Sequence, residues 1–263
     1  MTDPMTLPPA MSQRAREFTG PPAPARPAAT VVLLRPHGDT YQVYVLRRAT
    51  TMVFGGVYAF PGGVVDPTDQ PTTVRTDWSA RLGVPDEQAR AVVGAAAREL
   101  FEEAGILLAG PLSEPDRTVT ATGAPDWEAD RAAVQRREIT MTELLARRSL
   151  RLRDDLLLPW ARWVTPDFEP RRYDTWFFAA LLPEAQTARD VSGEADGTAW
   201  IDPHAGDLPM LPPTRRTLDQ IAACRSIPDV VAASAHRDAA TPMNPRIEIT
   251  ADGQVTVHLP DQN

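Results

Sequence analysis

The sequence contains one cysteine, Cys224, and this scarcity excludes an intrachain disulfide framework. It also lacks an apolar run of about 18 residues, the length that a membrane-spanning helix needs, so we expect no membrane partner. Basic residues are outnumbered, with 27 Lys and Arg against 35 Asp and Glu and a formal net charge of −8. This excess of acid disfavours a general nucleic-acid binder. A chain with a single cysteine fits a reducing compartment, and we expect a cytoplasmic location.

Residues 1–27 are rich in Pro and Ala and lack the continuous apolar stretch of a signal peptide. We therefore predict a disordered leader at 1–27, a main domain at 28–225 and a C-terminal extension at 226–263. The extension is expected to contain a helix and a β-hairpin, because residues 246–259 form two alternating runs around Asp252-Gly253. The chain ends Pro260-Asp261-Gln262-Asn263, which is no obvious peroxisomal signal.

Strand and helix signals mix irregularly along the main domain. Apolar and alternating runs predict strands at 29–35, 41–48, 57–60, 161–165, 175–182 and 198–201. Helices are predicted at 77–82, 86–104, 127–148, 213–224 and 227–236. In the second of these, Asp86 is a suitable N-cap and Gly105 a suitable residue to end the helix. This order indicates an α+β fold or an α/β/α sandwich.

The Ala-rich helix predicted at 86–104 carries three acids within little more than one turn. Glu99, Glu102 and Glu103 stand at positions i, i+3 and i+4, so all three side chains share one face. A solvated acidic face is the alternative, but such close like charges repel, and a cation between them would relieve the repulsion. Ligands that are all oxygen suit Mg²⁺ or Mn²⁺ better than zinc. Arg98 stands four residues before Glu102 and can orient it through an ion pair.

A second motif, Phe60-Pro61-Gly62-Gly63, follows a predicted strand, and its glycines allow close backbone approach to a ligand. Together with the acidic helix it resembles the box of the Nudix family, G-x5-E-x7-R-E-U-x-E-E-x-G-U, where U is a bulky aliphatic residue. The matching residues are Gly63, Arg98, Glu99, Leu100, Glu102, Glu103, Gly105 and Ile106.

The chain departs from this pattern between Gly63 and Arg98, where extra residues predict an insertion at about 69–92. The mid-box glutamate therefore has two candidate counterparts, Asp69 and Glu87. An interrupted box, together with motifs at 163–166, 170–173 and 211–214, resembles the subgroup that includes peroxisomal coenzyme A diphosphatases. The accessory motif of another coenzyme A-cleaving branch is poorly matched, because Met52 occupies the place of its arginine.

The resemblance implies a Nudix-like α/β/α sandwich with a mixed sheet and a catalytic loop-helix-loop. It also implies Mg²⁺ or Mn²⁺ held by Glu99 and Glu103, with Glu102 bound directly or through water and the Gly63 carbonyl as a further ligand. The general base is either a box glutamate or a carboxylate from a later loop. Nudix proteins often carry a functional Glu in such a loop, which makes Glu194 the preferred general base.

Other roles are weighed from residue type. Glu169 is the alternative base. For both Glu194 and Glu169, the role of a surface acid without a part in catalysis is equally favoured. Four arginines are candidates to grip phosphates, although each is individually more typical of a surface side chain: Arg47, Arg48, Arg171 and Arg172.

The implied function is hydrolysis of a diphosphate bond in a nucleoside diphosphate linked to another moiety, with coenzyme A or an acyl derivative as the leading substrate. NADH, ADP-ribose, a nucleotide sugar and a dinucleoside polyphosphate are the alternatives. A catalytically silent, nucleotide-binding regulatory domain is an alternative of another class. A small-molecule partner is expected, and Nudix domains frequently form homodimers.

Overall fold

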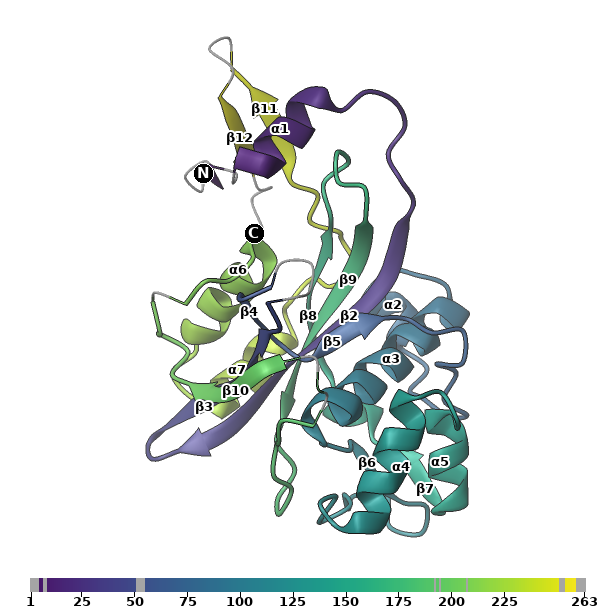
Figure 1. The fold of residues 1–263 in the computed structure, drawn as a ribbon. Helices are drawn as coiled ribbons and strands as arrows, with labels where there is room; N and C mark the ends of the chain where they lie inside the picture. Colours follow the sequence, from purple (N-terminus) through teal and green to yellow (C-terminus); the bar gives the residue numbers. More distant parts are fainter. Residues whose placement is uncertain are drawn as a thin grey trace.

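The computed structural model describes residues 5–6, 9–50, 55–191, 193, 195–206, 208–250 and 254–258. Its centre is a mixed seven-stranded sheet with helices on both sides, which confirms the predicted α+β sandwich (Figure 1). The strands of this sheet are β2 (Ala25–His37), β3 (Thr40–Arg48), β4 (Tyr58–Ala59), β5 (Gly62–Val64), β8 (Leu158–Val164), β9 (Arg172–Leu181) and β10 (Ala195–Ile201).

The sheet runs in the order β10-β3-β2-β9-β8. Among the strands that the structure describes in this sheet, only β2 and β9 pair in parallel, and the other strand pairs are antiparallel. The short strands β4 and β5 add to β3 and β2 respectively, so the segment that joins them passes from one strand to the other. This crossing sets Gly63 opposite Ala29 of β2, beside the helix that carries the acids.

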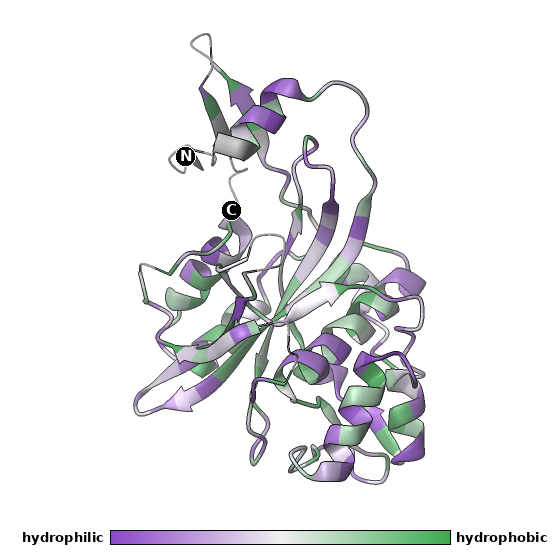
Figure 2. Ribbon diagram, viewed as in Figure 1, coloured by the Kyte–Doolittle hydropathy of each residue, from purple (hydrophilic) through white to green (hydrophobic). Residues whose placement is uncertain are grey.

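Helices cover the two faces of the sheet separately. They are α2 (Trp78–Leu82), α3 (Asp86–Ala104), α4 (Pro125–Gln135) and α5 (Met141–Arg147) on one face, and α6 (Pro212–Ala222) and α7 (Ile227–Ser234) on the other. Strand β2 shows why, because Val31 and Leu33 join the first core while Val32 and Leu34 join the second. Apolar residues of the helices pack against the sheet in these two cores, and Figure 2 shows hydrophobic stretches, in green, in the strands and in the helices. A two-stranded sheet of β6 (Ala109–Pro111) and β7 (Leu150–Leu152) and a 3₁₀ helix (Asp154–Leu156) complete this domain.

Helix α3 forms as the sequence predicts and ends at Gly105, whose φ of 69° is left-handed. Its start differs by one residue. Pro85 occupies the N-cap and Asp86 is the first helical residue, where its charge still favours the helix dipole. The apolar side of α3 lies against β2 and β5, and this packing orients its acids toward the glycine turn.

The single helix predicted at 127–148 is wrong, because the structure divides it into α4 and α5. Arg137 adopts a left-handed φ of 61°, which ends α4. Thr140 then starts α5 through a capping box in which its side chain accepts from the Glu143 amide while the Glu143 carboxylate accepts from the Thr140 amide. The charged pattern of 127–148 contains neither Gly nor Pro, so it gave no sign of the break.

The predicted disorder of residues 1–27 is also wrong for part of that range. Helix α1 spans Pro9–Glu17, β1 spans Met5–Thr6, and β2 begins at Ala25. Strand β1 pairs with β12 (Val255–His258), which pairs with β11 (Arg246–Ile249), so the predicted C-terminal hairpin is present with its turn outside the described residues. We call α1, β1, β11 and β12 the terminal module (Figure 1).

The terminal module is held to the loop between β8 and β9 by a small apolar cluster. Phe168 of this loop packs with Ala15 and Val255. Burial of these apolar side chains explains why a Pro- and Ala-rich segment becomes ordered, since it shares its core with the far end of the chain. Among the described residues, no helix combines the length and the apolar character that crossing a bilayer requires.

Candidate functional site

Arg98 lies at the centre of the candidate site and is 1% exposed. Its Nε and Nη2 donate to the two carboxylate oxygens of Asp69, at 2.7 and 2.9 Å. Its Nη1 donates to Glu99 at 2.6 Å and to Glu102 at 3.3 Å, so the lateral ion pair expected from the spacing exists. Nη2 also donates to the Val64 carbonyl at 3.0 Å, which ties the helix to the end of β5.

Glu99 lies directly against the glycine turn and is 8% exposed. A β-carbon at Gly63 would overlap the Glu99 carboxylate, so only glycine allows this approach. Burial raises the pKa of Glu99 to about 7, although the Arg98 guanidinium beside it acts in the opposite direction. The positive charge that the protein supplies therefore does not fully compensate this carboxylate.

The other two acids also contact groups that fix their direction. Glu103 accepts a hydrogen bond from the Gly62 amide at 2.8 Å. Glu102 is 6% exposed and accepts from Arg98 and, at 2.5 Å, from Nη1 of Arg137. Two of the three acids thus contact the glycine turn, while the third is directed toward arginines.

The two candidates for the mid-box acid have different surroundings. Asp69 is 2% exposed and forms the two-pronged ion pair with Arg98. Glu87 lies exposed in the first turn of α3. In the structure, therefore, Asp69 is the candidate whose contact supports the site. The segment after Asp69, which includes α2, lies between the glycine turn and α3 along the chain.

This cluster offers oxygen ligands to a divalent cation. Among the described residues, no three His, Cys, Asp or Glu side chains converge as a ready-made ligand set. The reason is local, since Glu102 is directed at Arg98 and Arg137 while Glu103 is held by the Gly62 amide. The donor chemistry nevertheless fits a hard cation, because every acid offers only oxygen and Glu99 is buried with incomplete charge compensation. The residues fit, and a direct bond from Glu102 would require its carboxylate to move away from Arg137.

The four arginines proposed for phosphate binding do not form one group. Arg47 is exposed at the end of β3, and the neighbouring Arg48 has a buried Nε without a hydrogen-bond partner among the described residues. Arg171 is exposed in the loop before β9. Arg172 is occupied, because its guanidinium donates to the Thr165 and Ala23 carbonyls and to Asp167.

The sheet register separates Arg172 from the acids. It stands opposite Ala25 of β2, whereas Gly63 stands opposite Ala29, four residues further along the same strand. At about 3.3 Å per residue this is roughly 13 Å along the sheet. Arg172 therefore serves the loop at the terminal module, while Arg47 and Arg48 stay the better candidates for phosphate.

The two proposed bases are placed differently. Glu194 lies outside the described residues. Glu169 is 6% exposed and accepts from Nε and Nη2 of Arg14 in α1, at 3.3 and 2.8 Å. That carboxylate belongs to the contact between the terminal module and the β8–β9 loop, which argues against a role as the base.

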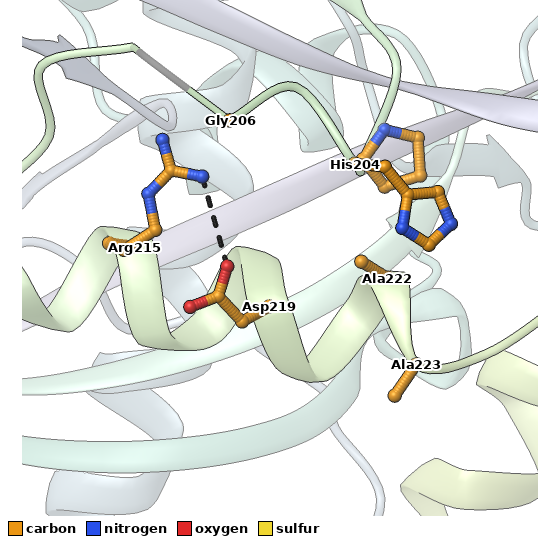
Figure 3. Close-up of a pocket in the computed structure, with 7 residues that line it drawn as sticks. His204, Gly206, Arg215, Asp219, Ala222 and Ala223 are labelled. Atoms are coloured by element: carbon orange, nitrogen blue, oxygen red, sulfur yellow. Dashed lines mark ion pairs between the residues drawn. The ribbon is translucent and has the colours of Figure 1, made fainter. Parts of the chain in front are cut away.

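A separate hollow of about 470 Å³ lies beside α6, on the face of the sheet opposite α3. Figure 3 shows its lining, with Arg215 and Asp219 3.8 Å apart. The Arg215 guanidinium is already used by the Ala205 and Leu208 carbonyls, each at 3.0 Å. Because no acid of the box motif reaches this hollow, we assign it no part in the chemistry of the site.

The sequence-based interpretation missed two arginines that contact Glu102. Arg131 of α4 donates to its backbone carbonyl at 3.0 Å, and Arg137 contacts its carboxylate. Both stand far along the chain in a segment without a motif, so no local signal could have identified them. They join α4 to the C-terminal end of α3.

Comparisons with known proteins agree on one family. A Caenorhabditis elegans protein assigned as nudix hydrolase 7 is 31% identical over 196 residues, which cover 72% of this chain. The chain spans only 57% of that relative's length. The crystal structure of a Nudix hydrolase from Alicyclobacillus acidocaldarius is similar with a TM-score of 0.66 and 28% identity, over 80% of this chain and 96% of that one. No protein-family model matches the chain.

Proposed function

This chain belongs to the Nudix hydrolase family, and from that membership we propose that it hydrolyses a diphosphate bond with Mg²⁺ or Mn²⁺ as its cofactor. The substrate is a nucleoside diphosphate linked to another moiety. The observation that carries the proposal is the contact of Glu99 and Glu103 with the Gly62-Gly63 turn, organised by buried Arg98. This contact unites the two separated motifs in one acidic site.

The roles of the residues follow from their contacts. Glu99 and Glu103 would hold the cation, with Glu102 bound directly or through water and the Gly63 carbonyl as a further ligand. When bound, the cation supplies positive charge to the diphosphate oxygens and polarises the attacking water. Arg98 keeps two of the acids oriented and cannot itself reach a substrate, because its guanidinium is filled by protein partners.

Hydrolysis adds water across one P–O–P link and breaks a single P–O bond, so each product keeps one phosphate group. The attacking water must lose a proton to a base during this step. We propose Glu194 as the acceptor, since Glu169 is held by Arg14. Arg47 and Arg48 would bind the phosphates that face away from the acids.

Coenzyme A or an acyl derivative is the substrate that we propose first, because of the motifs at 163–166, 170–173 and 211–214. The alternatives are NADH, ADP-ribose, nucleotide sugars and dinucleoside polyphosphates. A silent regulatory domain is less favoured, since a pure binder has no need for three acids on one face. A homodimer is a further proposal, which the molar mass in solution tests.

The deciding experiment is a Mg²⁺-dependent hydrolysis screen of these substrates with Glu103→Gln beside the wild type. We expect the variant to lower kcat/KM by about 100-fold or more, since loss of an outer partner of a metal ligand already costs 10–100-fold. Mg²⁺ at about 100 times its dissociation constant should stabilise the wild type by roughly 2.7 kcal/mol, and Glu103→Gln should reduce that gain.

Products with the phosphates divided between two fragments identify the reaction class. Asp130→Asn is a matched control, because Asp130 of α4 pairs with Arg148 at the end of α5 and takes no part in the proposed site. Retained tight ligand binding without turnover of any substrate would contradict the hydrolase proposal and favour the regulatory one.

A further inference from the structure

Arg137 contacts the candidate site from outside both sequence motifs. It follows α4, and its Nη1 donates to Oε1 of Glu102 at 2.5 Å. Its Nε lies 3.4 Å from Asp66, in the loop that follows β5. One guanidinium therefore bridges the acidic helix and the loop after the glycine turn.

The backbone at Arg137 is unusual for its residue type. Helices α2 and α3 both end in a left-handed residue, and in each that residue is glycine, Gly83 and Gly105. In helix α4 the C-cap is Arg136, and the next residue, Arg137, takes the left-handed conformation at a φ of 61°, as Ser149 does after α5. A side chain in this conformation costs free energy that glycine avoids, and such strain is concentrated at functional sites. The position thus retains a guanidinium where the backbone favours glycine.

The two arginines at Glu102 differ in their freedom to move. The Arg98 side chain is 2% exposed, and Asp69, Glu99 and Val64 also hold it. The Arg137 side chain is 42% exposed, and its Nη1 also donates to the Val134 and Gln135 carbonyls at the end of its own helix. It can leave Glu102 for solvent while Arg98 still pairs with that buried carboxylate. Arg137 is therefore the partner that Glu102 can exchange.

We propose that Arg137 is a positioning residue that acts as the charge partner of Glu102 and competes with the divalent cation for that carboxylate. The inference rests on the proposed cation site and adds a determinant of its affinity. The guanidinium holds Glu102 in place and balances its charge until a cation takes the carboxylate. Because the two positive groups exclude each other at Glu102, Arg137 lowers the affinity of the site for the cation.

The experiment is titration of Mn²⁺ into the metal-free full-length protein by calorimetry, at fixed pH and salt. Arg137→Gly removes the guanidinium and suits the left-handed backbone, so we expect a folded variant that binds Mn²⁺ about tenfold more tightly. Arg137→Lys keeps a cation and should bind nearly as the wild type does. Arg136→Ala is the control, because Arg136 is exposed and pairs with Glu138 at 2.7 Å.

Tighter Mn²⁺ binding by Arg137→Gly, together with a lower kcat, would support the inference. General damage to the site would instead weaken Mn²⁺ binding and lower kcat together. Equal or weaker Mn²⁺ binding by this variant, beside a wild type that binds, would overturn the inference and leave the proposed function standing. Absence of Mn²⁺ binding by the wild type and by Arg137→Gly would instead overturn the cation site on which both depend.

Discussion

Glu99 shows how a single carboxylate can serve chemistry at the expense of stability. Its side chain is buried between Arg98 and Gly63, and burial raises its pKa to about 7. The folded metal-free protein therefore binds a proton here more tightly than the unfolded chain does. Stability from this group is present in full at acidic pH and is lost as the pH rises toward 7.

Glu99→Gln should consequently stabilise the metal-free protein above pH 7, by on the order of 1 kcal/mol or more. Below about pH 4 the variant and the wild type should have similar free energies of unfolding, since Glu99 is then neutral in both states. Denaturant melts in chelator at pH 4, 6 and 8 measure the difference. A variant that is less stable than the wild type at pH 8 would refute the argument.

At the scale of elements, the ion pair of Asp69 with Arg98 joins the loop after β5 to helix α3. Both side chains are at most 2% exposed, so neither charge can turn to water if its partner is removed. The pair holds the two halves of the site together, although residues 70–85, which include α2, separate them along the chain. The loop is anchored before the chain leaves for α2, and α3 is anchored at the same point.

Asp69→Asn should lower the free energy of unfolding by about 3 kcal/mol, because it leaves a buried guanidinium without a full counter-charge. Asp77→Asn is the matched control. Asp77 pairs with Arg75 where the two side chains are 44% and 46% exposed, and loss of such a pair costs less than about 1 kcal/mol. Thermal or urea unfolding of the two variants measures these changes. Equal losses of unfolding free energy in Asp69→Asn and Asp77→Asn would contradict the structural role of the Asp69–Arg98 pair.

Helices and loops also show how much of the fold and of the candidate site could be predicted from the sequence. Helix α3 follows from an Ala-rich run that ends in Gly105, and the positions of its three acids follow from helical periodicity alone. The choice between Asp69 and Glu87 depends on a contact through space, which spacing along the chain does not contain. The break at Arg137 was hidden for a similar reason, since contacts to Glu102 and Asp66 accompany a conformation that local propensity disfavours.

At the scale of the whole molecule, the terminal module is separate from the core that supports the acids. It is connected to the domain through Phe168, which packs on Ala15 and Val255, and through the pair of Arg14 with Glu169. Helix α3 takes no part in this small cluster. We therefore expect the module to open without unfolding the sheet.

Phe168→Ala should test this independence. Amide hydrogen exchange in residues 9–17 and 254–258 should accelerate by about tenfold or more, since an aromatic anchor is lost, while exchange in 86–104 stays unchanged. Phe18→Ala is the control, because Phe18 is 37% exposed and lies outside the cluster. Faster exchange throughout α3 in Phe168→Ala would mean that the module and the domain unfold together.

The pairing of β1 with β12 sets Met5 opposite Val257, so the polypeptide closes into a loop without a covalent bond. A peptide linker between the paired strands would therefore preserve the order of the sheet. New ends could be opened in the turn at Gly38, which is exposed and has open space around it. Circular permutation is thus compatible with this topology, and an affinity tag attached beside either paired strand would lie near the other.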